Sequence, residues 1–351
     1  MAGADVEAGP QTSQFRCSYC GAPLDVTPDS VVVVCSYCGK ANFVAGDIPK
    51  EDLGDPVAVP AIKSDEAAKA AVEAARRSLE LRLRFKRLTF GDPDLYYVPY
   101  YFVSAKLRAS YRARVEVTYT RTTYVGGRAQ TEVVSRTVNV SGRVEHGGTI
   151  PVLARRNVGG VAAERLARHY METAPKAAPL EGIPLDQRTS KAFLAAEFGK
   201  SRAIAVALRE AVDELLKEVD RDAKRRAADA VGHPAASATI LDRTVDYEVE
   251  RVDSTPVTYL PVWVAPYIYE GSLYSFALAG WDGALLAAAR PVFMEQRIGY
   301  AAAAVLAAGL MGGLGGAMFL SNWAVGAGLV GLGGALGYLA ARNIAKVRSV
   351  R

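Results

Sequence analysis

The sequence predicts an α+β protein in three parts, and three patterns in the chain lead to this prediction. All four cysteines of the 351 residues lie within 17–38, in two copies of one pentapeptide. Long runs in the middle of the chain alternate apolar with polar residues, which is typical of strands with one buried face. No charged residue occurs from 298 to 341. We therefore expect a small metal-bound module, a central antiparallel-sheet domain with a helical insertion, and a C-terminal two-helix transmembrane hairpin.

The cysteines predict a four-sulfur metal site. Cys17 and Cys20 form one Cys-x-x-Cys-Gly copy, Cys35 and Cys38 form the other, and fourteen residues separate the two pairs. Each pair directs two thiolates at one ion, and two pairs complete the tetrahedron that structural zinc prefers. Because all four ligands are protein side chains, no coordination position is left for water or a substrate. We expect a zinc ribbon over 14–45 with a structural rather than a catalytic ion.

Iron in a rubredoxin-like site is the closest alternative to zinc, since four thiolates serve either metal. Two disulfides are a further alternative, but the polar and acidic N-terminus lacks the apolar core of a secretory signal. We expect residues 1–13 to be a disordered tail. Within the ribbon, Val31–Val34 and Ala41–Val44 predict two short paired strands. A module of this size needs its metal to fold.

The central domain is predicted over 64–296, after a linker at 46–63 that contains Pro and Asp. Ser64 and the two acidic residues after it open a helix that continues to Leu79. Apolar residues then alternate with basic ones over 81–86, which predicts a strand with one buried face.

A long β-hairpin is predicted next, followed by a helical insertion. Apolar residues occupy every second position over 107–119, and Gly126-Gly127 turns the chain back into a strand that ends near Val144. Helical character takes over in an insertion at about 155–232. Its strongest helix is predicted over 201–229.

Strands are predicted again over 245–289, and they contain an echo of the first strand region. Tyr97–Val103 (YVPYYFV) parallels Tyr259–Val264 (YLPVWV). One explanation is a proline that fits only at the first residue or the edge of a strand, flanked by aromatic residues that pack the sheet. The other explanation is a duplicated β unit interrupted by the helical insertion.

The uncharged run is too long for one crossing of a bilayer, whose apolar core is about 30 Å thick. A single Ser-Asn pair divides it, so we expect membrane helices at 298–320 and 323–341, followed by a basic tail at 342–351. Glycines recur four residues apart in both helices, which predicts a homo-oligomer formed through them. Basic residues flank the run on both sides. The lipid bilayer is therefore an expected partner, with the protein in the cell membrane and both termini in the cytoplasm.

Six features occur in an order that carries a resemblance to a known family. They are the cysteine pairs, the helix opened by Ser64-Asp65-Glu66, Val98-Pro99-Tyr100, Leu260-Pro261-Val262-Trp263, Tyr267-x-Tyr269-x-Gly271 and the terminal uncharged run. The chain resembles the prokaryotic membrane-anchored zinc-ribbon proteins, often labelled primosomal-helicase-like or transcription factor IIB-type. Relatives commonly carry an Asn-Gly-x-Thr-Gly turn where this chain has Ala279–Gly283 (AGWDG). The resemblance implies no settled activity, although some relatives look like membrane partners of envelope-stress or membrane-remodelling proteins.

Motifs for catalysis are not found in the chain. Gly199-Lys200-Ser201 looks like the end of a phosphate-binding loop, but Leu194 stands where that motif requires a glycine. The three histidines, His146, His169 and His233, lie in unrelated sequence contexts. We therefore expect no catalytic residues and no enzyme activity.

Nucleic-acid binding is the main alternative to protein binding. Arg108, Arg112 and Arg114 are predicted on one sheet face, with Tyr97 and Tyr101 near it. The formal net charge is only +5, however, and the ribbon itself contains few basic residues, so its attraction for phosphate is weak.

Tyrosines at the tips of the two cysteine turns suit a contact with protein. Tyr19 and Tyr37 each stand between the two cysteines of one copy. Together with the predicted anchor, they lead us to expect a membrane-anchored, cytosol-facing zinc-ribbon adaptor that binds protein partners without catalysis.

Overall fold

The computed structural model of the protein describes residues 15–26, 30–44, 52, 54–125, 128–156, 158, 162–188, 193–232 and 237–291, with scattered residues between 305 and 338. These residues form an α+β fold dominated by sheet. The chain divides into two compact units, which we describe separately. Unit 1 consists of Met1–Ala61 and Tyr96–Pro261, and unit 2 consists of Ile62–Leu95 and Val262–Arg351.

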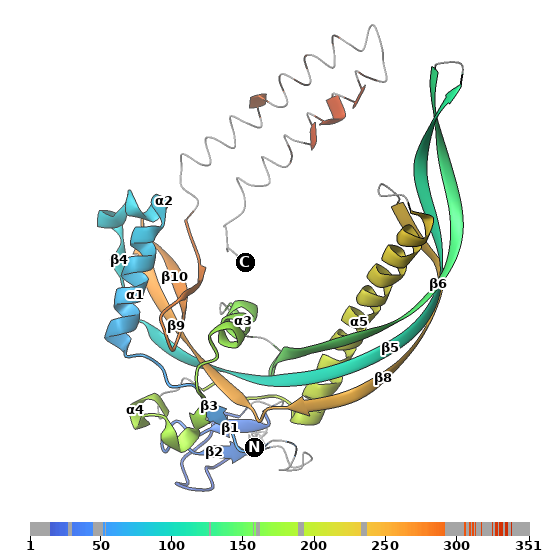
Figure 1. Ribbon diagram of the computed structural model, residues 1–351. Helices are drawn as coiled ribbons and strands as arrows, with labels where there is room; N and C mark the ends of the chain where they lie inside the picture. The colour runs from blue at the N-terminus through green and yellow to red at the C-terminus, as the bar shows by residue number, and fades with distance from the viewer. Residues whose placement is uncertain are drawn as a thin grey trace, which may run out of the picture. The chain divides into compact units, whose positions relative to one another are not determined.

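Three long antiparallel strands dominate unit 1. They are β5 (Asp94–Val125), β6 (Arg128–Leu153) and β8 (Ser237–Ser254). Strand β5 lies between the other two and pairs with both (Figure 1). Side chains of β5 alternate between buried and outward-facing from residue 103 to 117, because successive residues of a strand point to opposite faces. The predicted long hairpin is thus confirmed, with longer strands than expected, while its Gly126-Gly127 turn lies outside the described residues.

A long helix covers the buried face of these strands. Helix α5 (Lys200–Val231) lies along their concave side in Figure 1, and the predicted helix at 201–229 is confirmed. Its buried apolar residues recur at every fourth position and are Ala203, Ala207, Ala211, Leu215, Val219, Ala223 and Ala227. The last five of them pack against the inward side chains of β5, so this face of the sheet forms an apolar core of unit 1.

One carboxylate is buried in this core. Asp222 of α5 is only 6 % exposed and accepts hydrogen bonds from the Tyr111 hydroxyl at 2.6 Å, from Arg226 Nε at 2.7 Å and from Arg225. Burial acts to raise the pKa of Asp222, but these hydrogen bonds act the other way and hold it below its usual value. Gly142 of β6 leaves room for the cluster, because a Cβ there would lie 2.8 Å from the Tyr111 hydroxyl oxygen.

Shorter elements complete unit 1. The predicted strand pair of the cysteine module is confirmed as β1 (Val32–Val34) and β2 (Ala41–Phe43), which are antiparallel. The remaining elements are β3 (Val57–Ala58), α3 (Ala163–Thr173), β7 (Ala178–Pro179), the 3-10 turn η3 (Leu180–Gly182) and α4 (Leu185–Arg188). Strand β3 pairs antiparallel with β7 and parallel with the first residues of β9 (Thr258–Tyr269).

Unit 2 is a small helix-on-sheet unit. Its elements are α1 (Ser64–Arg77), α2 (Leu79–Arg82), the 3-10 turn η2 (Phe85–Arg87), β4 (Thr89–Phe90), the rest of β9, β10 (Ser272–Ala279) and β11 (Leu285–Ala288). Alanines of α1 pack on aromatic residues of β9 and β10. The strand predicted over 81–86 is wrong, because this segment forms α2 and η2. Leu81 is fully buried there, whereas Leu83, expected on the same face, is 73 % exposed.

The two echo segments lie in the long strands β5 and β9. Corresponding tyrosines of the segments, Tyr97 and Tyr259, contact the same ring of Phe193. The Tyr97 ring stacks on it with centroids 4.1 Å apart, and the Tyr259 ring meets it edge-on at 5.1 Å. The echo therefore supplies two walls of one aromatic cluster in unit 1.

The predicted transmembrane hairpin at 298–320 and 323–341 is wrong. Most of these residues lie outside the described part of the chain, and among the described residues no helix is long and apolar enough to cross a membrane. A crossing needs about 20 consecutive apolar residues in one helix. The described residues between 305 and 338 are helical, but they are scattered and make up no such helix. Helix α5 has the length, at 32 residues, but is charged along most of it.

The predicted location in the cell membrane with cytoplasmic termini is wrong for the same reason. The lipid bilayer as a partner and a homo-oligomer formed through these helices stay predictions. Residues 1–13 and 342–351, predicted as a disordered tail and a basic tail, lie outside the described residues.

Candidate metal centre

The two cysteine turns of unit 1 fold in the same way. In the first turn the Cys17 N–H donates to the Ala22 carbonyl at 2.8 Å, and the Gly21 N–H donates to the Cys17 carbonyl at 2.9 Å. The second turn repeats both bonds around Cys35, at 2.9 and 2.8 Å. Gly21 and its counterpart Gly39 have φ angles of +73° and +68°, in the left-handed region that glycine adopts without steric cost. The glycine after each cysteine pair is therefore required by the backbone.

The four sulfur atoms lie together. All of them are within 4.8 Å of one another, with 3.6 Å between the Sγ atoms of Cys17 and Cys38 and 3.8 Å between those of Cys20 and Cys35. A tetrahedral ion with metal–sulfur bonds of about 2.3 Å requires sulfur–sulfur edges of about 3.8 Å. A disulfide requires about 2.05 Å. The structure thus brings the four predicted ligands together in a site that can hold a metal ion, the only such group among the described residues.

Asn42 supports the cluster, and sequence reasoning gave it no role. This β2 side chain is 5 % exposed, and its oxygen accepts hydrogen bonds from the Ser18 N–H at 2.9 Å and the Ser18 hydroxyl at 3.1 Å. Its amide nitrogen donates to Cys17 Sγ at 3.4 Å. A residue four positions after the second cysteine pair thus holds the first one. The corresponding position of the first copy is Leu24. This difference between the two copies was the sequence signal that could have pointed to Asn42.

The thiols of the cluster differ in acidity. Burial acts to raise the pKa of Cys17, but hydrogen bonds from the Cys20 and Tyr19 backbone and from Asn42 outweigh it and lower the pKa to about 6. Burial is also the main reason that the pKa of Cys38 rises to about 12, and the neighbouring thiols add to this rise. Four adjacent thiolates therefore need the positive charge of a metal ion to coexist.

The ribbon is attached to the rest of unit 1 rather than free to swing on its linker. The N–H groups of Val31 and Val32 both donate to the Ala196 carbonyl, the first at 2.7 Å, and the Ala196 N–H returns a bond to Val32 at 3.1 Å. The Lys40 ammonium forms an ion pair with Glu181 at 2.9 Å. Backbone pairing and burial of Val31–Val34 fix the orientation of the metal site.

Aromatic side chains project from the ribbon into solvent. Tyr19 is 67 % exposed and Tyr37 is 64 % exposed, at the same position of the two turns. Phe15 and Phe43 are 44 % and 37 % exposed. The Lys40 ammonium lies 5.8 Å from the centre of the Tyr19 ring, a distance at which a cation is attracted to the ring face. The ribbon surface is therefore unusually rich in aromatic groups for its size.

The segment that resembles a phosphate-binding loop has a structural role. Ser201 lies in the first turn of α5, and its N–H and hydroxyl both hydrogen-bond Asp52, the N–H at 2.9 Å. A carboxylate of the chain itself therefore occupies the place at the helix N-terminus where an anion would bind. Leu194, which replaces the required glycine, donates its N–H to the Tyr97 carbonyl at 3.0 Å. Asp52 was not identified from the sequence because it lies 149 residues before Ser201 in the chain.

The remaining candidate residues do not form a site. His146 lies on β6, where its Nδ1 is 3.1 Å from Glu218 of α5, His169 lies in α3, and His233 falls outside the described residues. Arg108 is paired with Glu145 at 3.0 Å on the outer face of the long strands.

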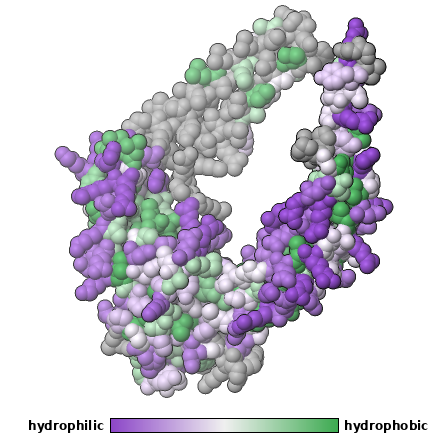
Figure 2. All heavy atoms as spheres, viewed as in Figure 1, coloured by the Kyte–Doolittle hydropathy of each residue, from purple (hydrophilic) through white to green (hydrophobic). Residues whose placement is uncertain are grey.

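The tyrosines that were expected beside the basic sheet face are buried. Tyr97 and Tyr101 are 0 % exposed, and their hydroxyls donate to Gln187 at 2.9 Å and to the Phe198 carbonyl at 3.1 Å. They cannot stack on nucleic-acid bases. Acidic and basic groups are mixed on the outer face of the long strands, and Figure 2 shows hydrophilic residues over much of the visible surface of this region.

Comparison with known proteins adds no family to these observations. The resemblance stated from the sequence therefore stays a prediction. No family model, no curated protein and no solved structure matches this chain.

Proposed function

We propose that the protein is a non-catalytic adaptor whose zinc ribbon binds a protein partner. The observation that carries the proposal is the exposure of Tyr19 and Tyr37 at equivalent positions of a rigidly attached ribbon. Tyrosine offers a large apolar ring and a hydroxyl at little cost in side-chain entropy, which is why it is enriched at protein interfaces. Because both rings are held beside the metal, their spacing is set before a partner arrives, and this lowers the entropic cost of binding.

Zinc is the metal that we propose for the site. The four-thiolate set has no open position, which suits a structural ion that fixes the two turns. Iron is the competing ion for the same ligands. Elemental analysis of the purified full chain should find about one zinc per chain. If the analysis instead finds one iron per chain, with the visible absorption of a ferric thiolate centre, the metal is iron. The proposed structural role of the site would not change.

Nucleic-acid binding has less support. The ribbon contributes only Arg16 and Lys40 as cations, and Lys40 is already paired with Glu181. Binding to phosphate draws on several cations and weakens steeply with salt. Nucleic acid that copurifies in a salt-sensitive manner would favour this alternative over the adaptor.

The test compares a double variant with a matched control. Tyr19→Ala/Tyr37→Ala removes both knuckle rings, whereas Tyr124→Ala removes a ring that is 77 % exposed on β5, away from the ribbon. Proteins captured by the tagged full chain after cross-linking are quantified by mass spectrometry, with metal content measured in parallel. We expect a specific partner to be lost only with the double variant, which keeps its metal. Equal recovery with all three proteins would contradict the proposal.

A further inference from the structure

The two outer strands of the long sheet have unpaired edges of different character. In the described part of the chain, β6 and β8 each pair only with β5, so each offers backbone groups that a further strand can bind. The β8 edge is protected from such pairing. It has two register shifts against β5, and its 18 residues include seven charged ones, Asp242, Arg243, Asp246, Glu248, Glu250, Arg251 and Asp253. Bulges and charges are the usual devices that keep an edge single.

The β6 edge is less protected, although it includes Pro151 near its end. It pairs with β5 in unbroken register over its whole 26-residue length. It is longer than β8 but contains fewer charged residues, which are Arg128, Glu132, Arg136, Arg143 and Glu145. A regular edge of this length is a template for another strand unless it has a partner.

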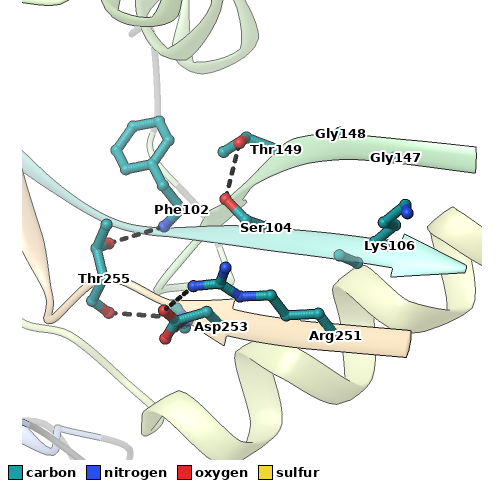
Figure 3. Close-up of a pocket in the computed structure, with 11 residues that line it drawn as sticks. Phe102, Ser104, Lys106, Gly147, Gly148, Thr149, Arg251, Asp253 and Thr255 are labelled. Atoms are coloured by element: carbon teal, nitrogen blue, oxygen red, sulfur yellow. Dashed lines mark hydrogen bonds and ion pairs between the residues drawn. The ribbon is translucent and has the colours of Figure 1, made fainter. Parts of the chain in front are cut away.

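Two adjacent glycines in β6 point to a close approach of another chain. Glycine weakens the interior of a strand and often marks a place where a ligand or a second backbone comes near. Packing within the chain does not require these glycines, since a Cβ on Gly148 would meet nothing within 4 Å and one on Gly147 would approach no atom closer than 3.8 Å. Figure 3 shows both on β6 beside Ser104 and Lys106, at a hollow of about 620 Å³.

We infer that a second copy of this chain binds the β6 edge, with the two β6 strands antiparallel about a two-fold axis at Val144. A two-fold axis perpendicular to the sheet places residue i opposite residue 288 − i of the second copy and keeps each face of the sheet continuous. The inference is independent of the ribbon and of its proposed partner. It joins the long strands β8, β5 and β6 of the two copies into one run of six strands.

This register matches charges on the outer face. Arg143 lies opposite Glu145 of the second copy, and by symmetry the contact occurs twice. Arg143 is exposed and forms no ion pair with any described residue. Glu145 contacts Lys106 and Arg108 in its own chain and still exposes half of its side chain, so one further cation can bind it.

The same register matches apolar groups on the inner face. Val138 lies opposite Ile150 of the second copy, and both are half-buried residues that already pack against the core. Gly148 lies opposite Val140 and Gly147 opposite Ser141. The glycines therefore fall where two backbones would meet.

Neighbouring registers are unfavourable, and this is the reason for preferring a second copy over an unrelated strand. A shift of two residues one way places Arg143 opposite its own symmetry mate, and the other shift does the same with Glu145. A shift of one residue places the inner side chains on the outer face. A strand selected for an unrelated partner has no reason to be complementary to itself in a single register.

Charge reversal tests both the pairing and its register. The mass of the purified full chain is measured by sedimentation equilibrium over a range of concentrations. We expect a dimer for the wild type, and a dissociation constant at least about tenfold weaker for Arg143→Glu, because two attractive contacts become repulsive. Arg112→Glu is the matched control, since Arg112 is exposed on the same face but lies on the central strand β5. It should dimerise like the wild type.

Mixing separates the proposed register from a general effect of charge. Arg143→Glu and Glu145→Arg should each be monomeric alone, yet form a mixed dimer, because each then offers the charge that the other lacks. A monomeric wild type, undiminished dimerisation of Arg143→Glu, or failure of the two variants to associate would overturn the inference. Tyr19→Ala/Tyr37→Ala should dimerise normally, so failure here is distinct from failure of the adaptor proposal.

Discussion

The ribbon and the long sheet of unit 1 depend on different sources of stability. The long sheet buries a continuous row of inward side chains of β5 under α5. The ribbon has two strands of three residues each, and its centre is occupied by four sulfur atoms. The long sheet is stabilised by the burial of its own apolar side chains, whereas the ribbon requires a bound metal ion. We therefore expect the stability of the ribbon to depend on bound metal and the stability of the long sheet not to depend on it.

Removal of a metal ligand should have the largest effect. Cys35→Ser takes one thiolate from the site, and structural zinc sites contribute roughly 10–16 kcal/mol of apparent binding free energy to folding. We expect the ribbon to lose its metal and become sensitive to protease, while far-ultraviolet circular dichroism of the long strands and α5 stays unchanged. Ser36→Ala is the neighbouring control and should keep the metal. Loss of the whole fold on chelation would remove the distinction between the regions.

A cavity in the core of the long sheet should destabilise the sheet and leave the metal content of the ribbon unchanged. Leu215 of α5 is 0 % exposed, so Leu215→Ala should lower the free energy of unfolding by about 2–5 kcal/mol. Val206→Ala, on the same helix but 45 % exposed, should cost much less. Denaturant titration followed by α5 helicity measures both. Metal content should stay at the wild-type level, and a parallel loss of metal would show that the regions are coupled.

Loss of the Asn42 side chain should affect the ribbon alone and more mildly. Asn42→Ala removes the bond to Cys17 Sγ and both bonds to Ser18. Groups that orient metal ligands are typically worth about 10–100-fold in metal affinity. Competition with a chromophoric chelator measures this affinity, and an affinity equal to that of the wild type would mean that Asn42 does not orient the site.

The smallest effect should come from the buried carboxylate, and it should depend on pH. Asp222→Asn replaces charge-assisted hydrogen bonds by weaker ones, at a cost of about 1–2 kcal/mol near neutral pH. Because the pKa of Asp222 is lowered in the fold, its contribution is present above the unfolded pKa of about 3.9 and is lost as pH falls through the folded value. The stability difference between variant and wild type should therefore shrink on acidification. A difference that is constant from pH 7 to pH 3 would exclude ionised Asp222 as its cause.

Local periodicity predicted the regular elements, and contacts between distant residues were missed. Two-residue alternation over 107–119 was long enough to identify β5, but the short alternation over 81–86 was overridden by helical turns that bury Leu81 alone. Cysteine spacing predicted the metal ligands because it acts within one turn. The contacts of Asn42 with Ser18, of Asp222 with Tyr111 and of Asp52 with Ser201 span 24 to 149 residues, so no local motif contains these contacts. The uncharged C-terminal run misled because lack of charge does not by itself establish a helix that is long and apolar enough to cross a membrane.

The fourfold spacing of the buried residues in α5 sets the coiling of the strands beneath it. An α-helix has 3.6 residues per turn, so each step of four residues moves the buried position about 40° further around the helix axis. Between Ala211 and Ala227, the residues that pack on the long strands, the stripe rotates by about 160°, and the strands must wind with it to stay in contact. The spacing of the buried residues of α5 therefore sets how strongly the strands that pack on it must coil. One residue inserted at its middle would turn the second half of the stripe by about 100° and direct charged side chains at the sheet.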